Sequence, residues 1–228
     1  MKKTVLVLLF LYTCIGSIQA QQFKPFSTHY SGHGYYNGEN EKTGVMNKNG
    51  KAYTPAMYDA VSEIQEGLIR VELNGKTGFV DTTNRVIIPF EYDIDTLFFT
   101  NNRYLQTLVS FDQDGKESTK SLVYTHSRSY YNGFSDGLCA VVKDGKYGFI
   151  DKGNKVVIPF IYEAADNFRN DEYAIVMKNG KQGLIRKNGD EVVPFAYDEI
   201  FWNESFMESD AELLVFKSGT KEYLKIQK

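Results

Sequence analysis

Cysteine is almost absent from this chain of 228 residues, which contains Cys14, Cys139 and no third. Cys14 lies in an N-terminal segment that we expect to be removed, so the mature chain would keep a single thiol. One cysteine cannot form an internal disulfide, and the fold must therefore be stabilised by packing. We expect Cys139 to be a small buried residue of a strand rather than a reactive nucleophile.

Residues that mark metal sites are also scarce, since the chain has three histidines. His29 and His33 are four residues apart, but the glycines around them oppose a helix, and no cysteine or acidic cluster completes a zinc site. The segment Asp112–Gly115 lacks the third Asp or Asn and the distant Glu of a calcium loop, and a hairpin turn explains it better. We therefore expect no metal and no cofactor.

Motifs of catalysis and of nucleic-acid binding are missing as well. The sequence contains no Gly-x-Ser-x-Gly elbow, phosphate-binding glycine loop or His-Glu-x-x-His. We expect no enzymatic activity; a cleft that joins His126 to a carboxylate and a hydroxyl would reopen that question. Without Lys2 and Lys3 the chain has 24 basic and 29 acidic side chains, a net charge of −5, and no basic cluster. Nucleic acid is therefore excluded as an expected partner.

Long apolar runs are confined to the N-terminus. Lys2 and Lys3 precede the apolar run Val5–Ile15, and Ser17–Ala20 offers a small residue at a cleavage point. This pattern predicts a signal peptide over residues 1–20 and no membrane span. We expect a secreted protein, placed in the periplasm, on the cell surface or outside the cell.

A lipoprotein is the alternative, with Cys14 as the lipidated first residue. Thr13 argues against it, because the residue before such a cysteine is normally very small. Cleavage before Gln21 remains the expectation, and the sequence leaves lipidation at Cys14 open.

The chain is organised by repetition. Gly78–Asp93 reads GFVDTTNRVIIPFEYD, and related copies occupy Gly148–Glu163, Gly183–Asp198 and, more weakly, Gly44–Asp59. A period of roughly 35 residues indicates one small structural unit that is used several times.

Each copy contains the signals of antiparallel hairpins. Asn-Gly or Asp-Gly dipeptides at 74–75, 144–145 and 179–180 supply the positive φ angles of tight turns. They join strands such as Leu68–Leu73 and Lys76–Asp81. A further β-branched strand follows, and we expect it to stop, or to lie at a sheet edge, at Pro89 and its equivalents, because proline lacks the ladder donor.

These signals predict an all-β fold of tandem three-stranded antiparallel meanders. The units form either an open twisted array or one that curls towards a propeller or barrel, since both bury the same strand faces. Residues 21–43 are expected to be a lead-in or cap. Residues 44–228 are expected to hold about five units, of which one near 100–130 is degenerate.

Polar and aromatic motifs recur with the repeat. Every copy ends in Tyr-Asp or Tyr-Glu, and one interpretation of this pattern is a row of carboxylates that binds a ligand or a cation. We favour a structural role, in which Tyr packs on the repeat and the carboxylate accepts backbone N–H groups. Tyr-Tyr-Asn-Gly occurs at 35–38 and 130–133 and is either an aromatic contact loop or, as we prefer, an ordinary turn.

The repeated pattern resembles the bacterial WG-repeat family, most clearly over Gly148–Asp166 together with Phe134–Val142. The resemblance covers most of residues 44–217. The family's Trp before the motif glycine is replaced by Thr43, Thr77, Tyr147 and Gln182, and the second proline of its Pro-Pro pair by Ala or Phe. Membership implies a β-rich interaction module and little about activity.

We therefore expect a structural or protein-interaction module whose partner is an unknown protein. Surface or cell-wall polysaccharide is the alternative partner, to be recognised by a row of exposed aromatic side chains. The candidate contact residues, chosen where the repeats differ, are Tyr130, Tyr131, Phe201 and Trp202. The expected structural motif positions are Gly78, Pro89, Tyr92, Gly148, Pro159, Tyr162, Gly183, Pro194 and Tyr197.

Overall fold

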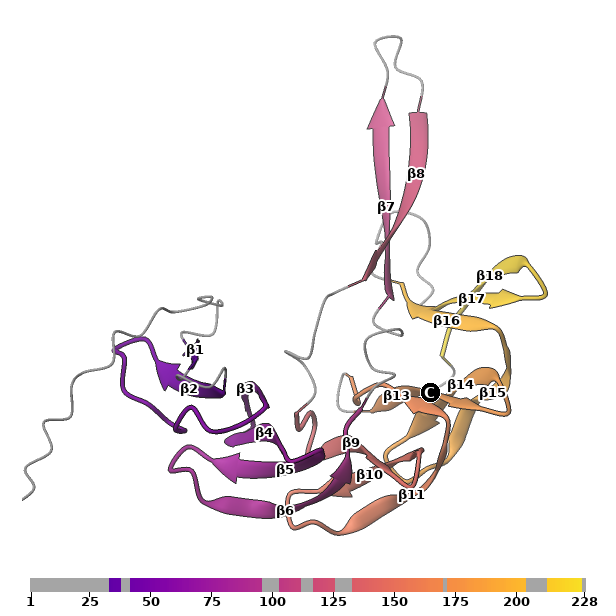
Figure 1. Cartoon of the computed structure of the whole chain (residues 1–228). Coiled ribbons are helices and arrows are strands. Elements are labelled where there is room, and N and C mark those ends of the chain that lie inside the picture. Colours follow the sequence, from indigo (N-terminus) through magenta and orange to yellow (C-terminus); the bar gives the residue numbers. More distant parts are fainter. Residues whose placement is uncertain are drawn as a thin grey trace, which may run out of the picture.

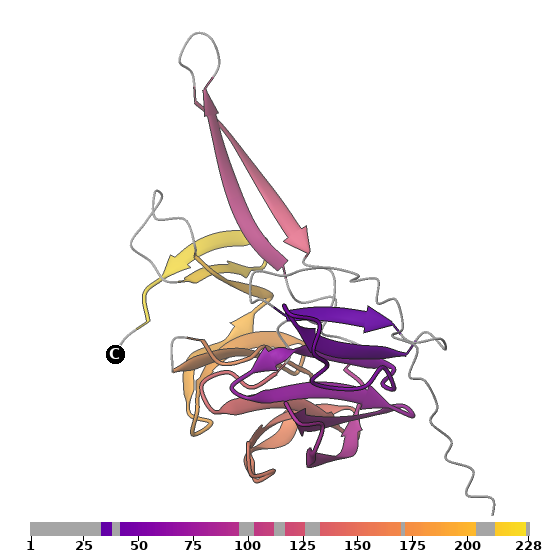
Figure 2. The ribbon, with the colours of Figure 1, turned by 90° about the vertical axis from the view of Figure 1, so that its left-hand side faces the viewer.

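The computed structural model describes residues 33–37, 42–95, 103–111, 117–125, 133–169, 172–203 and 213–226. Within these residues the chain forms strands and turns and contains no helix. The sheets follow one another along an open arc, and one two-stranded hairpin stands away from it (Figures 1 and 2). The all-β prediction is confirmed, and of the two expected arrangements the open twisted array is the one observed.

The arc is built from short antiparallel strands. Their bounds are β1 His33–Asn37, β2 Thr43–Asn47, β3 Ala60–Gln65, β4 Leu68–Leu73, β5 Lys76–Asp81, β6 Val86–Asp93, β7 Arg103–Phe111, β8 Glu117–Thr125, β9 Leu138–Lys143, β10 Lys146–Asp151, β11 Val156–Tyr162, β12 Ala164–Ala165, β13 Tyr173–Lys178, β14 Lys181–Arg186, β15 Glu191–Tyr197, β16 Glu199–Trp202, β17 Leu213–Lys217 and β18 Thr220–Leu224.

The central sheet has seven strands in the order β11-β10-β9-β6-β5-β4-β3, so it joins two units. The next units form the sheets β12-β13-β14-β15 and β16-β17-β18. The tight turns have the expected conformation: Asn74 and Gly75 have φ angles of 52° and 77°, as a type I′ hairpin requires. The register between β4 and β5 runs without interruption from Leu68↔Asp81 to Leu73↔Lys76.

The last strand of each unit continues past its proline. We call β6, β11 and β15 the outer strands and include under that name the equivalent segment 51–57, which is irregular apart from an isolated bridge at Ala52. In Figures 1 and 2, β6 and β11 lie on the side of the array away from the projecting hairpin. β11 reaches Tyr162, and its register with β10 shifts on either side of the pair Phe149↔Ile158. Pro159 lies just after this pair, so the strand tolerates its missing donor and bends instead of ending.

The core lies between units, and the strands β4, β9 and β13 each contribute an apolar face to it. Ile69, Cys139 and Ala174 are fully buried, and Val71 and Val141, two residues further along, are 0% and 1% exposed. The predicted apolar face is therefore confirmed, with Cys139 as one of its small residues. Because each cluster draws residues from two neighbouring units, no unit can bury its apolar face alone.

Residues 103–125 depart from the meander pattern. Within the segment 100–130, where the sequence predicts a degenerate unit, β7 and β8 pair from Arg103↔Thr125 to Phe111↔Glu117. They form a two-stranded sheet of their own. The hairpin is therefore an insertion in the chain between β6 and β9, which still lie next to each other in the seven-stranded sheet.

The final unit lacks an outer strand among the described residues, where β18 pairs with β17 alone. Glu222 faces Val215 across this pair, the register position that Gly148 occupies opposite Val141. A side chain thus stands where the other units have the motif glycine.

Candidate interaction surface

The carboxylate of each Tyr-Asp or Tyr-Glu motif joins two neighbouring units. Asp59 pairs with Lys42 of its own unit and accepts a hydrogen bond from the backbone N–H of Asn74, in the turn of the next unit, at 2.9 Å. Glu163 repeats the arrangement, with the N–H of Gly180 at 2.8 Å and Lys146 at 3.7 Å. These contacts match the structural role that the sequence favours.

The following unit uses the same device. Asp198 pairs with Lys181 and accepts the N–H of Ser218 at 2.7 Å. The hydrogen bond from Lys181 and then that from Ser218 hold the pKa of Asp198 below its ordinary value. The carboxylates are therefore ionised structural groups rather than a free acidic row.

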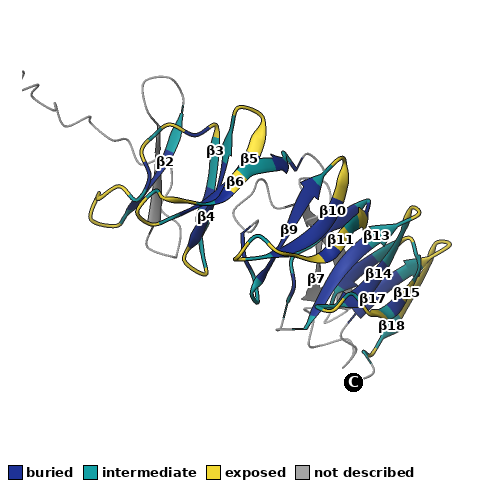
Figure 3. Ribbon diagram, turned by 90° about the horizontal axis from the view of Figure 1, so that it is seen from below, coloured by how far each residue is buried: buried dark blue, intermediate teal, exposed yellow. Residues whose placement is uncertain are grey.

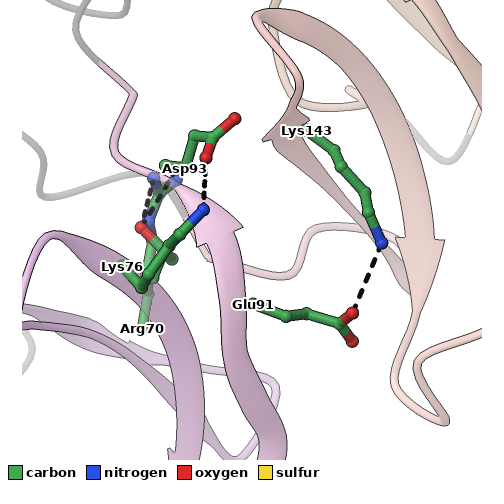
Figure 4. A network of polar contacts seen from close by, with 6 residues as sticks. Arg70, Lys76, Glu91, Asp93 and Lys143 are labelled. Carbon is green, nitrogen blue, oxygen red and sulfur yellow. Dashed lines mark hydrogen bonds and ion pairs between the residues drawn. The ribbon is translucent and has the colours of Figure 1, made fainter.

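Figure 4 shows the same tie at the centre of the array, together with a second ion pair beside it. Lys76 contacts Asp93 at 2.6 Å, and Lys143 of β9 reaches across to Glu91 of β6 at 3.4 Å. Glu91 also accepts a hydrogen bond from the side chain of Asn154 at 2.8 Å. Charged contacts thus reinforce the junction on both sides of β6.

The motif tyrosines form a second link between units. Tyr58 donates to Asn84 Oδ1 at 2.7 Å, and Tyr92 donates to Asn154 Oδ1 at 2.6 Å. Burial is the main reason that the pKa of Tyr92 rises to about 12. At the equivalent place opposite Tyr162 the chain has Gly189, so that junction has no amide acceptor.

The motif glycines are required by a close approach of the outer strand. A Cβ atom on Gly148 would lie 2.8 Å from the backbone oxygen of Ile158 and 2.9 Å from the ring of Phe160. Gly78 and Gly183 have the same surroundings. Phe160 in turn packs on Tyr92 of the preceding unit, with ring centroids 6.1 Å apart. The phenylalanine that replaces the family's second proline therefore contributes to the junction.

Polar contacts occupy the positions of the family's tryptophan. Tyr147 is 2% exposed and donates a hydrogen bond to Asp95, which is itself 5% exposed. Thr77 lies 3.4 Å from the buried guanidinium of Arg70. Gln182 accepts the backbone N–H of Ile200 at 2.6 Å. Hydrogen bonds at these positions therefore hold the neighbouring segments in place of tryptophan packing.

A buried acid lies near Asp95. Burial of the Asp166 carboxyl raises its pKa to about 7, an effect that Arg169 opposes and the charge of Asp95 reinforces, although part of the residue's surface remains exposed. Sequence reasoning did not identify Arg70 and Asp95 as buried charges, because each stands where other copies have an apolar or small residue.

The thiol of Cys139 is not arranged for chemistry. It is fully buried, and that burial raises its pKa to about 12. A thiol in this state is protonated at neutral pH and does not act as a nucleophile.

The candidate contact residues lie in different surroundings. Tyr130 and Tyr131 lie outside the described residues. Phe201 is 8% exposed and packs edge-on against Phe216 at 6.0 Å, which leaves little of its ring for a partner. Trp202 is half-buried beneath Arg169, whose guanidinium is 5.9 Å from the ring centroid. Of the two candidates that the structure describes, Phe201 is thus buried and Trp202 half-buried.

The exposed apolar surface lies elsewhere, on the outer strands (Figure 3). The structural motif residues of the outer strands differ in burial. The prolines Pro89, Pro159 and Pro194 are exposed, whereas Tyr92 and Tyr162 are buried and Tyr197 is half-buried. Outside β1, β7 and β8, every exposed large apolar side chain of the described residues lies on an outer strand. These residues are Met57 (43%), Val86 (49%), Val156 (46%), Val157 (37%) and Ile161 (43%).

Sequence reasoning missed these five residues because runs such as Val156–Ile158 read as fully buried strands. The register shift between Val156 and Ile158 leaves Val156 and Val157 exposed while Ile158 remains buried. The available signal was the position of the proline itself, which indicates an edge strand with one open side.

Two further expectations concern metals and membranes. The described residues contain no group of three or more His, Cys, Asp or Glu side chains placed to hold a metal ion. His29 and His126 are outside those residues. Nor does the described part of the chain include a helix with the length and apolarity needed to cross a membrane.

Similarity to known proteins indicates the family of this chain. A search of curated proteins finds no match. Among solved structures, "Crystal structure of the eukaryotic initiation factor" is similar at 12% identity and a TM-score of 0.27, over 86% of this chain and 62% of that one, which is too distant to carry an argument. The family model described as "WG containing repeat" matches residues 44–76, 78–104, 129–147, 147–181 and 183–206. The chain therefore belongs to the WG-repeat family.

Proposed function

We propose that this protein is a secreted, non-enzymatic module that binds a protein partner through its outer strands. The observation that carries this proposal is the position of the exposed large apolar side chains, all of which, outside β1, β7 and β8, lie on outer strands in the described part of the chain. Exposed apolar residues gathered on one element typically mark an interaction surface. The junction contacts support it, because they hold successive outer strands in a fixed arrangement.

Secretion is proposed from residues 1–20, and the absence of activity from the lack of catalytic motifs in the sequence. Polysaccharide binding is less well supported. Stacking on sugars needs exposed rings, and outside β1, β7 and β8 none of the aromatic side chains of the described residues is exposed. The outer strands offer aliphatic side chains instead, which favour a protein partner.

Affinity capture tests the proposal. The purified protein is offered to solubilised envelope proteins in one arm and to isolated cell-wall and surface polysaccharide in the other, and bound material is identified. We expect a specific protein that the variant Val86→Thr/Val156→Thr/Ile161→Thr retains at least several-fold less, with an unchanged melting temperature. Equal retention by the variant would contradict the use of the outer strands, and saturable polysaccharide binding would favour the carbohydrate alternative.

A further inference from the structure

The outer strand β11 has an unusual distribution of side chains. It holds three of the five exposed large apolar residues of the described structure, Val156, Val157 and Ile161. It is also an edge strand, because β10 is its one partner in the seven-stranded sheet. No other outer strand combines an open edge with three such side chains.

Charges of opposite sign lie at the two ends of this apolar stretch. Lys155 precedes β11 and is exposed, and no described residue forms an ion pair with it. At the far end Ile161 and Tyr162 lie beside the next unit, where Glu191 is exposed. Tyr162 packs on Phe195 of β15 with ring centroids 6.1 Å apart, and a Cβ atom on Gly189 would lie 4.0 Å from Ile158, so the segment in which Glu191 begins β15 lies beside β11.

The surface is therefore basic at one end, apolar in the middle and acidic at the other end. We call Lys155, Val156, Val157, Ile161 and Glu191 the β11 patch. A surface of this kind is complementary to itself when rotated by 180°, because the basic end of one copy then meets the acidic end of the other. The partner that fits best is thus a second copy of the same surface.

We propose that the β11 patch is the centre of a twofold contact between two copies of this chain. Val156, Val157 and Ile161 pack against their counterparts, and Lys155 of each copy pairs with Glu191 of the other. This inference rests on the proposed function, because it names a partner for the same outer surface. The inference does not require the second copy to be the sole partner of this surface.

The contact is made by side chains rather than by extending the sheet. Pro159 lies in the middle of β11 and has no N–H to donate to a strand added at the open edge. A strand added at this edge would therefore lack a backbone hydrogen bond at the centre of β11. Specificity must then come from the apolar side chains and from the two symmetry-related ion pairs.

Sedimentation of the purified protein over a concentration series, at low and high salt, tests the contact. We expect a monomer–dimer equilibrium that weakens with salt. Lys155→Glu should raise the dissociation constant about tenfold, because twofold symmetry replaces two attractions with two repulsions of modest size each. Glu191→Lys should do the same, and the double variant Lys155→Glu/Glu191→Lys should restore dimerisation.

Matched controls separate this contact from general stickiness. Ile161→Thr should weaken the dimer, whereas Met57→Thr, which removes an equally exposed side chain outside the β11 patch, should leave it unchanged. A monomer at all concentrations overturns the inference, as does a dimer whose strength ignores the charge reversals. The capture experiment remains informative in either case: retention of an envelope protein by monomeric Lys155→Glu protein would uphold the proposed function on its own.

Discussion

At the scale of the residue, Tyr92 and Tyr162 form a natural pair for measuring one hydrogen bond. Tyr92→Phe removes the 2.6 Å bond to Asn154 from a buried ring, and it should destabilise the protein by about 0.5–1.5 kcal/mol. Tyr162→Phe removes a hydroxyl that has no amide acceptor opposite it, so a smaller change is expected. Chemical denaturation of the two variants compares them directly. Equal losses would show that the link through Asn154 contributes nothing specific.

Asp166 allows a second measurement, in which the sign depends on pH. Its pKa in the folded protein, about 7, lies above the ordinary value of 3.8, so the folded state favours the protonated carboxyl. The resulting stability is fully present below pH 3.8 and is lost as the pH rises through 7. Asp166→Asn should therefore raise the melting temperature at pH 8 and change it little at pH 3.5. A variant that is destabilised at pH 8 would show that the ionised carboxylate has a stabilising partner.

At the scale of the element, the approach of the outer strand to the motif glycine limits what each unit can contain. Gly148→Val would bring its side chain within 3 Å of backbone atoms of β11, and we expect loss of the cooperative melting transition. Gly153→Ala is the matched control, since a Cβ there meets no atom closer than 3.3 Å. A Gly148→Val protein that melts like the control would refute the close-approach account.

The turns, the central strands and the apolar face follow from the sequence because Asn-Gly turns and alternating residues act locally. The predicted bounds Leu68–Leu73 and Lys76–Asp81 are those of β4 and β5. The outer strands were predicted too short, because their bulge depends on a neighbouring strand that the local sequence does not describe. The interior charges Arg70 and Asp95 were missed for the same reason, since their surroundings come from residues distant in the chain.

At the scale of the whole molecule, stability should fall in acid because the ties between units are ionised carboxylates. The pKa values of Asp59, Asp93, Glu163 and Asp198 are all lowered in the folded state. Their contribution is present above the unfolded-state values near 4 and is lost as the pH falls through the lower folded-state values. We expect the melting temperature to drop steeply below pH 4 and to vary less with these groups between pH 5 and 7. A flat profile across pH 4 would show that packing alone holds the units.

The side chain of Glu222 limits where a further repeat unit can be added to the array. Because Val215 faces Glu222 where other units place a glycine, an outer strand of the usual kind cannot cross β18. A duplicated unit of about 35 residues should therefore be accommodated between β15 and β16, where both neighbours provide compatible faces, but not after β18. Duplication of a unit is therefore expected to be possible within the array and to be prevented after the last described hairpin, because that hairpin has Glu222 in place of the motif glycine.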